Sequence, residues 1–368
     1  MEFSVKTSDL AQVLRLVQAV TERKTTIPIL GSILLTADSN GLTVAGTDLE
    51  LGAICRCPAT VRKTGMLAVP ARRLTAYVKM LPEGDIHFKE QASHWLAVSC
   101  ARSKSRIAGT AANSFPELPA LPENSVDLSC GVLARLAEKI IFAISPEQNS
   151  VTLSGALLKI EQSELTMVAT DGHRLAVASS QIEITGLDKP VQVLIPKKAV
   201  FELLRFSEGR NDQTVRCSFT DNHLFFSWSE RLLLSRKLSG SFPDYQRVLP
   251  NHSRSVTLER NELRSSVERV SRFSDSKTRA VVIDVSEGQF TLRAEESNIG
   301  DSEEVLPVAY EGDPVRLGFN SSYLADFLAR TEHQNVRFLF RDEASAAELQ
   351  PDTSTNGTYR YVVMPMRI

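Results

Sequence analysis

The chain has 368 residues, of which 42% are hydrophobic, so it can bury cores in two or three domains of about 100–200 residues each. A formal net charge of -2 does not favour a sequence-specific DNA-binding domain, which is usually basic overall. No apolar run approaches the roughly 18–20 residues that cross a bilayer, and the first residues lack the pattern of a signal peptide. We therefore expect a cytoplasmic protein that makes no membrane contact.

The cysteines do not indicate a disulfide framework or a structural zinc site. There are five of them, an odd number, and none has the C-x-x-C spacing. Cys55 and Cys57 alternate on an expected strand and so share one face, as a fragment of a metal site or as two strand thiols. The second interpretation is favoured, and we expect neither a metal nor a cofactor.

Three stretches of the chain begin alike, with a short alternating strand that runs into a helical pattern. They start at Ser4, Ser125 and Ser255, a period on the scale of a whole domain. In the first copy, Thr7 or Ser8 is placed to cap the first helical turn. The expected first helices cover Leu10–Val20, Leu133–Ile140 and Leu263–Val270.

Each copy continues with a hairpin and a second helix. The expected hairpin strands are 33–37 with 41–45, 156–160 with 164–169, and 280–285 with 289–294. Pro70 and Pro196 suit the first turns of two of the second helices, and Asn320 or a following Ser caps the third.

Three such units predict an α+β protein in which each domain has two helices packed on mainly antiparallel sheets. The expected domains are 1–121, 122–251 and 252–368. Lys and Arg exceed Asp and Glu by 4 in residues 1–120, whereas the balance is -1 in 121–250 and -5 in 251–368. Because repeated units can close a ring and the two end units are oppositely charged, we expect a head-to-tail homodimer of six domains.

Basic side chains recur on the second helices, away from the apolar stripe. They include Arg72 and Arg73 in the first copy and Lys197, Lys198 and Arg205 in the second. Such residues bind phosphate groups without reading sequence. For any single helix an ordinary solvated face is the simpler explanation, but recurrence across copies favours contact with duplex DNA.

Four segments resemble hallmark segments of the bacterial DNA polymerase III beta subunits, the beta sliding clamps. They are Gly46–Glu50, Val168–Ala176, Phe242–Pro250 and Tyr361–Arg367, and the resemblance covers essentially the whole chain. It implies the DNA clamp fold, a ring around duplex DNA and no catalysis. It also implies loading by an ATP-driven clamp loader and tethering of the replicative polymerase alpha subunit and other clamp-motif proteins.

The resemblance further implies three sets of functional residues. Partner peptides rich in Gln, Leu and Phe would dock between the second and third domains, where Met side chains give an adaptable surface and Arg174, Arg247 and Arg367 fix polar groups. The implied pocket residues are Leu153, Thr170, Gly172, His173, Arg174, Leu175, Pro243, Arg247, Val248, Val362, Met364, Pro365, Met366 and Arg367. The implied DNA contacts are Lys24, Arg72, Lys198 and Arg205. The implied ring interface joins Arg106 and Ile107 to Arg272 and Phe273.

Other functions remain open at this point. A specialised clamp paralogue or a DNA-binding scaffold that forms no ring would have a similar sequence. A hydrolase would need a triad such as Asp171 and His173 with Ser154 or Ser179, but the chain has no Gly-x-Ser-x-Gly elbow. Phosphate-loop and dinucleotide-binding motifs do not occur either. The sliding clamp is the favoured hypothesis.

Overall fold

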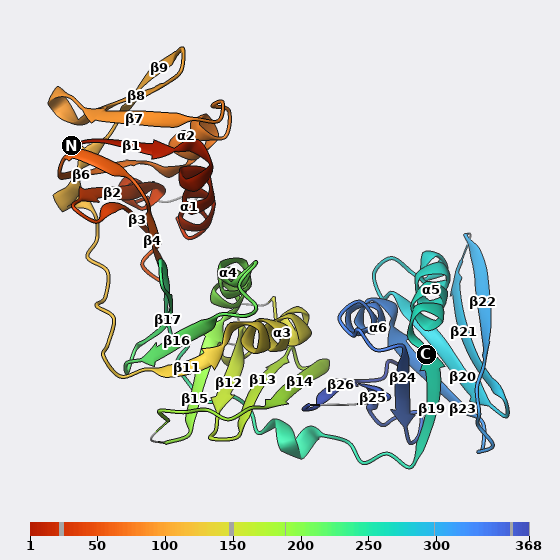
Figure 1. The fold of residues 1–368 in the computed structure, drawn as a ribbon. Coiled ribbons are helices and arrows are strands. Elements are labelled where there is room, and N and C mark those ends of the chain that lie inside the picture. The colour runs from red at the N-terminus through yellow and green to blue at the C-terminus, as the bar shows by residue number, and fades with distance from the viewer. Residues whose placement is uncertain (22–25, 147–150, 188, 298, 354–355, 368) are drawn as a thin grey trace. The chain divides into compact units, whose positions relative to one another are not determined.

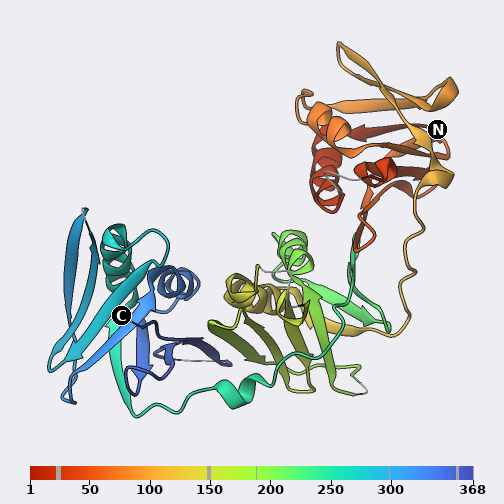
Figure 2. The same ribbon diagram turned by 180° about the vertical axis from the view of Figure 1, so that it is seen from behind.

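The computed structural model describes residues 1–21, 26–146, 151–187, 189–297, 299–353 and 356–367 (Figure 1; Figure 2). The chain forms two compact units. The first unit contains Met1–Gly131 and Lys198–Lys237, and the second contains Val132–Lys197 and Leu238–Ile368.

The first unit contains a five-stranded and a nine-stranded sheet, both antiparallel. The smaller sheet has the order β5 (Thr60–Lys63), β1 (Glu2–Lys6), β7 (Asp85–Glu90), β8 (Trp95–Cys100), β9 (Ser103–Ala108). The larger sheet has the order β10 (Thr110–Ala111), β6 (Gly65–Pro70), β2 (Ser32–Asp38), β3 (Gly41–Thr47), β4 (Leu51–Cys57), β18 (Arg231–Arg236), β17 (His223–Trp228), β16 (Thr214–Phe219), β11 (Val126–Ser129). Helices α1 (Thr7–Ala19) and α2 (Ala71–Val78) pack side by side in this unit (Figure 1).

The second unit has an eight-stranded and a four-stranded sheet, again antiparallel. The larger has the order β15 (Val191–Pro196), β12 (Gly155–Ile160), β13 (Glu164–Thr170), β14 (Arg174–Gln181), β26 (Tyr359–Val363), β25 (Ala347–Pro351), β24 (Asn335–Phe340), β19 (Arg254–Glu259). The smaller has the order β22 (Gly300–Pro307), β21 (Gln289–Glu296), β20 (Ala280–Ser286), β23 (Val315–Asn320). Helices α5 (Arg260–Val270) and α6 (Ser321–Leu328) are neighbours (Figure 2). The remaining helices are α3 (Cys130–Ile140) and α4 (Lys197–Ser207).

The expected repeat appears in the order of the elements. Each of the three copies has two helices, and all three expected hairpins form, as β2–β3, β12–β13 and β20–β21. The middle copy divides its strands between the two large sheets, through the pairs β4–β18 and β14–β26. Contact between copies is therefore made by continuous sheets, which explains why the compact units do not coincide with the sequence repeats.

One capping prediction is correct and another is wrong. The Asn320 side chain accepts a hydrogen bond from the Ser322 amide at 2.9 Å and caps α6 as expected. Neither Thr7 nor Ser8 caps α1, because the cap position falls on Lys6. Thr7 instead donates its hydroxyl to the carbonyls of Pro82, at 3.1 Å, and Gly84, at 3.0 Å. Its hydroxyl thus ties the helix to the loop before β7.

An aromatic core in the second unit joins helix α6 and the turn after α3 to strand β26 of the large sheet. Tyr361 of β26 is fully buried, with its ring 5.3 Å from Phe142 and 5.4 Å from Phe327 of α6. Tyr359, on the same strand face, lies 4.9 Å from Phe327. Aromatic pairs at these distances add to the stabilisation from buried area. This core fixes the position of β26, on which several expected site residues lie.

Candidate functional site

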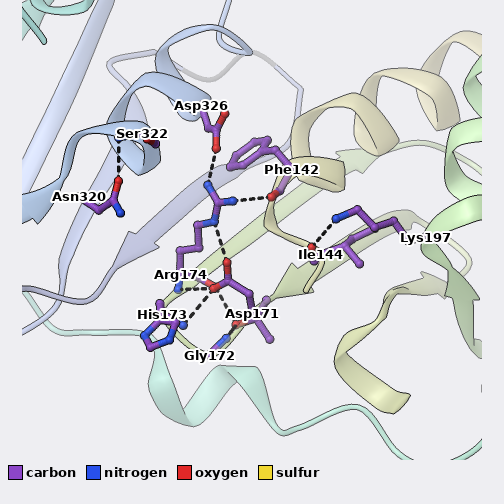
Figure 3. Close-up of polar contacts among 11 residues, drawn as sticks. Phe142, Ile144, Asp171, Gly172, His173, Arg174, Lys197, Asn320, Ser322 and Asp326 are labelled. Atoms are coloured by element: carbon purple, nitrogen blue, oxygen red, sulfur yellow. Dashed lines mark hydrogen bonds and ion pairs between the residues drawn. The ribbon is translucent and has the colours of Figure 1, made fainter. Parts of the chain in front are cut away.

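A polar turn connects β13 to β14 and contains much of the segment Val168–Ala176 (Figure 3). Asp171 Oδ1 accepts the amides of His173 and Arg174, at 3.0 and 3.1 Å. Thr170 Oγ1 donates to the Arg174 carbonyl at 2.7 Å and accepts the Gly172 amide at 3.1 Å. Gly172 has a φ of 89°, a conformation that favours glycine. The turn itself therefore accounts for the Thr-Asp-Gly run.

Arg174 connects this turn to two helical segments (Figure 3). Its Nε donates to Asp171 Oδ2 at 3.0 Å, and its Nη1 donates to Asp326 Oδ2 of α6 at 2.5 Å. Its Nη2 donates to the carbonyl of Phe142 at 2.7 Å. The guanidinium also lies 4.3 Å from the centre of the Tyr323 ring.

The surroundings of Arg174 hold it firmly in the charged form. Burial of the guanidinium by itself lowers the pKa, but the neighbouring Tyr361 and the bonds to Asp326 and Asp171 outweigh this effect and raise it. All three nitrogens already have partners inside the second unit. Arg174 therefore joins the polar turn to Phe142 and to α6, and its expected contact with polar groups of a bound peptide stays a prediction.

An apolar patch, which we call the site cluster, lies beside this turn in the second unit. Its buried members are Leu157, Val168, Leu175, Val177, Leu194 and Val362. Partly buried residues packed against them are Leu238, Phe242, Tyr245, Leu249 and Ala346. The cluster thus combines strands β12 to β15, strand β26 and the segment between β18 and β19.

Two large apolar side chains of the expected pocket are exposed to solvent. Val248 is 62% exposed and Met364 is 50% exposed. The Met364 amide donates to the His173 carbonyl at 2.9 Å, which joins the C-terminal segment to the polar turn. Exposed Val and Met side chains are suited to contact with apolar peptide residues.

The other expected pocket residues surround the site cluster in different environments. Leu153 is half-buried at the end of a short 3-10 turn, Val151–Leu153, and its carbonyl accepts the Ser145 amide at 3.0 Å. Arg247 is exposed and forms an ion pair with Asp244 at 2.8 Å. The residues Gly172, His173, Pro243 and Arg367 are exposed, whereas Pro365 and Met366 are half-buried.

Several residues of this region were not chosen from the sequence. Phe242 and Tyr245 belong to a segment that was singled out, but their packing against the site cluster was not foreseen. The available signal was the pair of aromatic residues, Phe242 and Tyr245, three positions apart in a segment between two strands. Tyr323 and Asp326, which contact Arg174, carried no local signal, since the contact spans 152 residues in the sequence for Asp326.

The basic residues expected to contact DNA differ in whether they already form ion pairs with acidic side chains. Arg72 is exposed on α2. Lys198 of α4 forms an ion pair with Asp48, and Arg205 Nη1 lies 3.3 Å from Glu202. Burial raises the pKa of Glu202. Lys24 lies outside the described residues.

The polar turn is repeated in the first unit, between β3 and β4. Asp48 Oδ1 accepts the amides of Glu50 and Leu51, at 3.0 and 2.6 Å, and Thr47 donates its hydroxyl to the Leu51 carbonyl at 2.6 Å. Leu49 occupies the position of Gly172 with a φ of 76°. In both turns a charged side chain forms an ion pair with the second helix of the following copy, through Lys198 in one case and Asp326 in the other.

The residues expected at the ring interface lie on edge strand β9 and in the 3-10 turn Ser271–Phe273, which packs against edge strand β22. Arg106 of β9 is exposed, 5.4 Å from the Trp95 ring. Ile107 is only 4% exposed because it lies opposite Leu96 within its own sheet, so it presents little apolar area in the single chain. Arg272 is exposed, and the half-buried Phe273 packs beside Gly300, the first residue of β22.

All five cysteines are buried. Burial raises the pKa of both Cys55 and Cys57 to about 12. Among the described residues, no group of three or more His, Cys, Asp or Glu side chains is arranged to hold a metal ion. In the same part of the chain, no helix combines the length and the apolar character needed to cross a membrane.

Comparison with known proteins places this geometry in a family. Residues 1–119, 127–244 and 246–367 match the N-terminal, central and C-terminal domains of the DNA polymerase III beta subunit. The chain belongs to the DNA polymerase III beta subunit family. Beta sliding clamps of Pseudomonas aeruginosa and Escherichia coli are 33% and 32% identical to it, and each match covers 100% of both chains.

Solved structures of beta subunits agree with the fold. The crystal structure of the DNA polymerase III subunit beta from Pseudomonas aeruginosa has a TM-score of 0.92 at 32% identity, with 100% of both chains covered. A Pseudomonas aeruginosa sliding clamp bound to griselimycin has a TM-score of 0.93 at 32% identity over the same coverage. The chain thus has the three-domain clamp fold.

Beta subunits are non-catalytic processivity subunits in DNA replication, and the polar turn here agrees with that role. The Asp171 carboxylate is occupied by two backbone amides and by Arg174. Asp171 thus shapes the turn and binds Arg174, which gives a structural reason for the neighbouring Asp171 and His173 that a hydrolase triad would need.

Proposed function

We propose that two copies of this chain close head to tail into a ring around duplex DNA. The proposed ring tethers the replicative polymerase and other clamp-motif proteins by binding their peptide segments at the site cluster, and a clamp loader places it on DNA in the cytoplasm. Its repeated units are domains 1–121, 122–251 and 252–368. Family membership and the full-length match to proteins named beta sliding clamp support this function.

The observation that carries the ring proposal is a junction that occurs twice within one chain. In each case the strand after the polar turn pairs antiparallel with the last strand of the following copy. Leu51, the first residue of β4, lies opposite Ser235 of β18, and Arg174, the first residue of β14, lies opposite Val363 of β26. Equivalent contacts that recur with a rotation generate closed rings.

The third copy has the strand for such a junction but no following copy in the chain. β22 occupies the position of β4 and β14 and lies at the edge of the four-stranded sheet. β9 occupies the position of β18, since both complete a hairpin with two turn residues, and it lies at the edge of the five-stranded sheet. β22 of one copy pairs with β9 of the other in the proposed ring.

The internal junction also gives the register of this pairing. The first residue of β4 meets the fifth residue of β18, Ser235, so Gly300 of β22 meets Ile107, the fifth residue of β9. Asp301 then lies opposite Arg106, and Glu303 lies opposite Lys104. All four side chains are exposed in the single chain. Opposite charges across antiparallel strands are stabilising.

The same register brings the expected apolar contact together. Phe273 packs beside Gly300, and Gly300 faces Ile107 of the other copy in the proposed pairing. Because Gly300 has no side chain, the half-buried Phe273 would lie close to the strand backbone at Ile107, whose own side chain is 4% exposed.

Charge reversal tests the proposed pairing directly. Arg106→Glu places like charges across the strands, so the solution mass by light scattering falls from about twice 40.6 kDa to that of one chain. Adding Asp301→Arg restores the opposite charges and the dimer. Arg62→Glu, an exposed change on edge strand β5 of the same sheet, leaves the dimer intact. A wild-type monomer, or no rescue by the second change, contradicts the proposed register.

Contact with DNA is assigned to the cations of α2 and α4 and to Lys24. Arg72 is free to meet a phosphate, whereas Lys198 and Arg205 would exchange Asp48 and Glu202 for phosphate oxygens. Partial neutralisation of this kind weakens each contact, which suits a protein that moves along DNA.

A further inference from the structure

Segment 238–253 runs from β18 to β19 and forms one wall of the site cluster. Its residues Leu238, Phe242, Tyr245 and Leu249 pack against the cluster. The segment also carries the exposed side chain of Val248. Its beginning is fixed to the sheet, because the Leu238 amide donates to the Leu194 carbonyl at 3.2 Å.

The other end of this segment is fixed by a buried histidine. The His252 side chain is 5% exposed, and its Nε2 lies 3.3 Å from Oε2 of Glu348, which is fully buried on β25. Arg360 of β26 donates hydrogen bonds to the same carboxylate from Nε at 2.6 Å and from Nη2 at 2.8 Å. Gln350 donates to it at 2.5 Å.

This polar group continues the site cluster along one face of the sheet. Glu348 lies opposite Val362, a member of the cluster. Ala346 packs against the cluster two residues before Glu348, and Arg360 lies two residues before Val362, so their side chains share that face. Glu348, which contacts His252, is therefore the direct cross-strand neighbour of Val362 in the site cluster.

Elsewhere in the second half of the segment the polar contacts are internal to it. Arg247 pairs with Asp244, and the Leu249 amide donates to the Gln246 carbonyl at 3.4 Å. Such bonds shape the turn Tyr245–Val248 but do not attach it to the sheet. Attachment depends on apolar packing, which is non-directional, and on the close contact between the buried His252 ring and the Glu348 carboxylate.

We propose that His252 is a positioning residue for partner binding: through Glu348 and Arg360 it fixes segment 238–253 and thereby places Val248 and Arg247 beside the site cluster. Arg360 holds the Glu348 carboxylate in place, so the His252 ring meets a partner whose position is already fixed. Because this segment is already ordered, it loses less conformational entropy when a peptide binds. The inference rests on the proposed peptide-binding function.

The test compares His252→Leu, His252→Gln and the neighbouring control Asn251→Leu in the full-length protein. Binding of a labelled peptide with a Gln followed by Leu and Phe is measured by fluorescence anisotropy. Loss of the imidazole contact in His252→Leu weakens binding about fivefold, close to the cost of ordering one side chain. Gln keeps a polar side chain that can contact Glu348 and stays within about twofold of wild type, as does the exposed Asn251→Leu change.

Amide hydrogen exchange at residues 245–249 provides a second measurement that does not require the peptide. His252→Leu accelerates exchange there, and His252→Gln does not, while the dimer mass and the unfolding midpoint confirm that each variant is folded. Unchanged exchange in His252→Leu overturns the proposal, as does faster exchange with unaltered peptide affinity. Absence of wild-type peptide binding overturns the proposed function instead, and the exchange comparison then decides whether His252 fixes the segment.

Discussion

Arg174 and Asp326 lie 152 residues apart in the sequence, and their side chains meet at 2.5 Å. The bond joins strand β14 of the central family domain to helix α6 of the C-terminal family domain. The Arg174 side chain is 11% exposed and also holds Asp171 and the Phe142 carbonyl. One side chain therefore fixes the polar turn, the end of the α3 region and α6 in a single arrangement.

Replacing Arg174 with Ala should lower the free energy of unfolding of the full chain by about 3 kcal/mol, because two carboxylates and a carbonyl lose a charged donor. Arg174→Lys should recover little of this loss, since an ammonium group cannot reproduce the three-way contact. Urea unfolding followed by circular dichroism measures the difference. Arg216→Ala, at an exposed site 3.8 Å from Asp127, should change stability by less than about 1 kcal/mol. Equal effects at the two sites would contradict the joining role of Arg174.

Met364→Ala should weaken binding of a clamp-motif peptide about tenfold without changing stability, because the side chain is 50% exposed and contributes contact area mainly to a partner. Isothermal calorimetry and thermal unfolding on the same sample separate the two effects. A large fall in stability with unchanged affinity would mean that Met364 belongs to the core.

Glu348 gives the stability a defined acid dependence. Burial alone would raise its pKa, but hydrogen bonds from Arg360 and Gln350 and the neighbouring His252 ring outweigh burial and lower the pKa to about 2. The resulting stabilisation is present above the unfolded-state pKa of about 4.3 and is lost as the pH falls toward 2. Between pH 5 and 3 the wild type should lose about 2 kcal/mol more than Glu348→Gln. Parallel curves for the two proteins in urea unfolding would show that the carboxylate is not held in this way.

The cysteines should be unreactive in the folded protein. Burial raises the pKa of Cys55 and Cys57 to about 12, so at pH 8 very little thiolate is present at either position. Ellman's reagent should label few thiols in native protein and all five after unfolding in guanidinium. Rapid native labelling of the Cys55 and Cys57 pair would revive the interpretation of this pair as a metal or redox fragment.

Arg72→Ala should weaken retention on duplex DNA to a similar extent for every sequence, since the expected contact is with phosphate. Its effect should shrink as salt rises, and the slope of log affinity against log salt should fall by about 1. Filter binding at a series of salt concentrations measures this slope. A sequence-dependent loss would contradict a phosphate contact.

Local patterns in the sequence were sufficient for the elements of the fold. Helical spacing predicted α1, α3 and α5, and turn residues between alternating strands predicted the three hairpins. The Asn320 cap was also readable, because its effect acts within two residues. The Thr7 cap was not, since the competing acceptors at Pro82 and Gly84 lie more than 70 residues away.

The resemblance supplied candidate site residues that the structure brings together, whereas contacts between distant parts of the chain could not be predicted. Leu175, Val362 and Met364 were expected, and the structure places Leu175 and Val362 in one cluster, with Met364 next to His173. The role of Arg174 could not be foreseen, because its acceptors Asp326 and Phe142 come from other parts of the chain. The contribution of the middle copy to two sheets likewise depends on pairing between strands far apart in sequence.

The ring itself is tested most directly by retention on nicked circular DNA after loading by a clamp loader, compared with the same DNA after linearisation. A closed ring stays on the circle in high salt and slides off once the DNA has ends, because it is held by topology and not by phosphate contacts. Retention that is lost in salt but does not depend on DNA ends would contradict encirclement and favour a scaffold that binds the outside of the duplex.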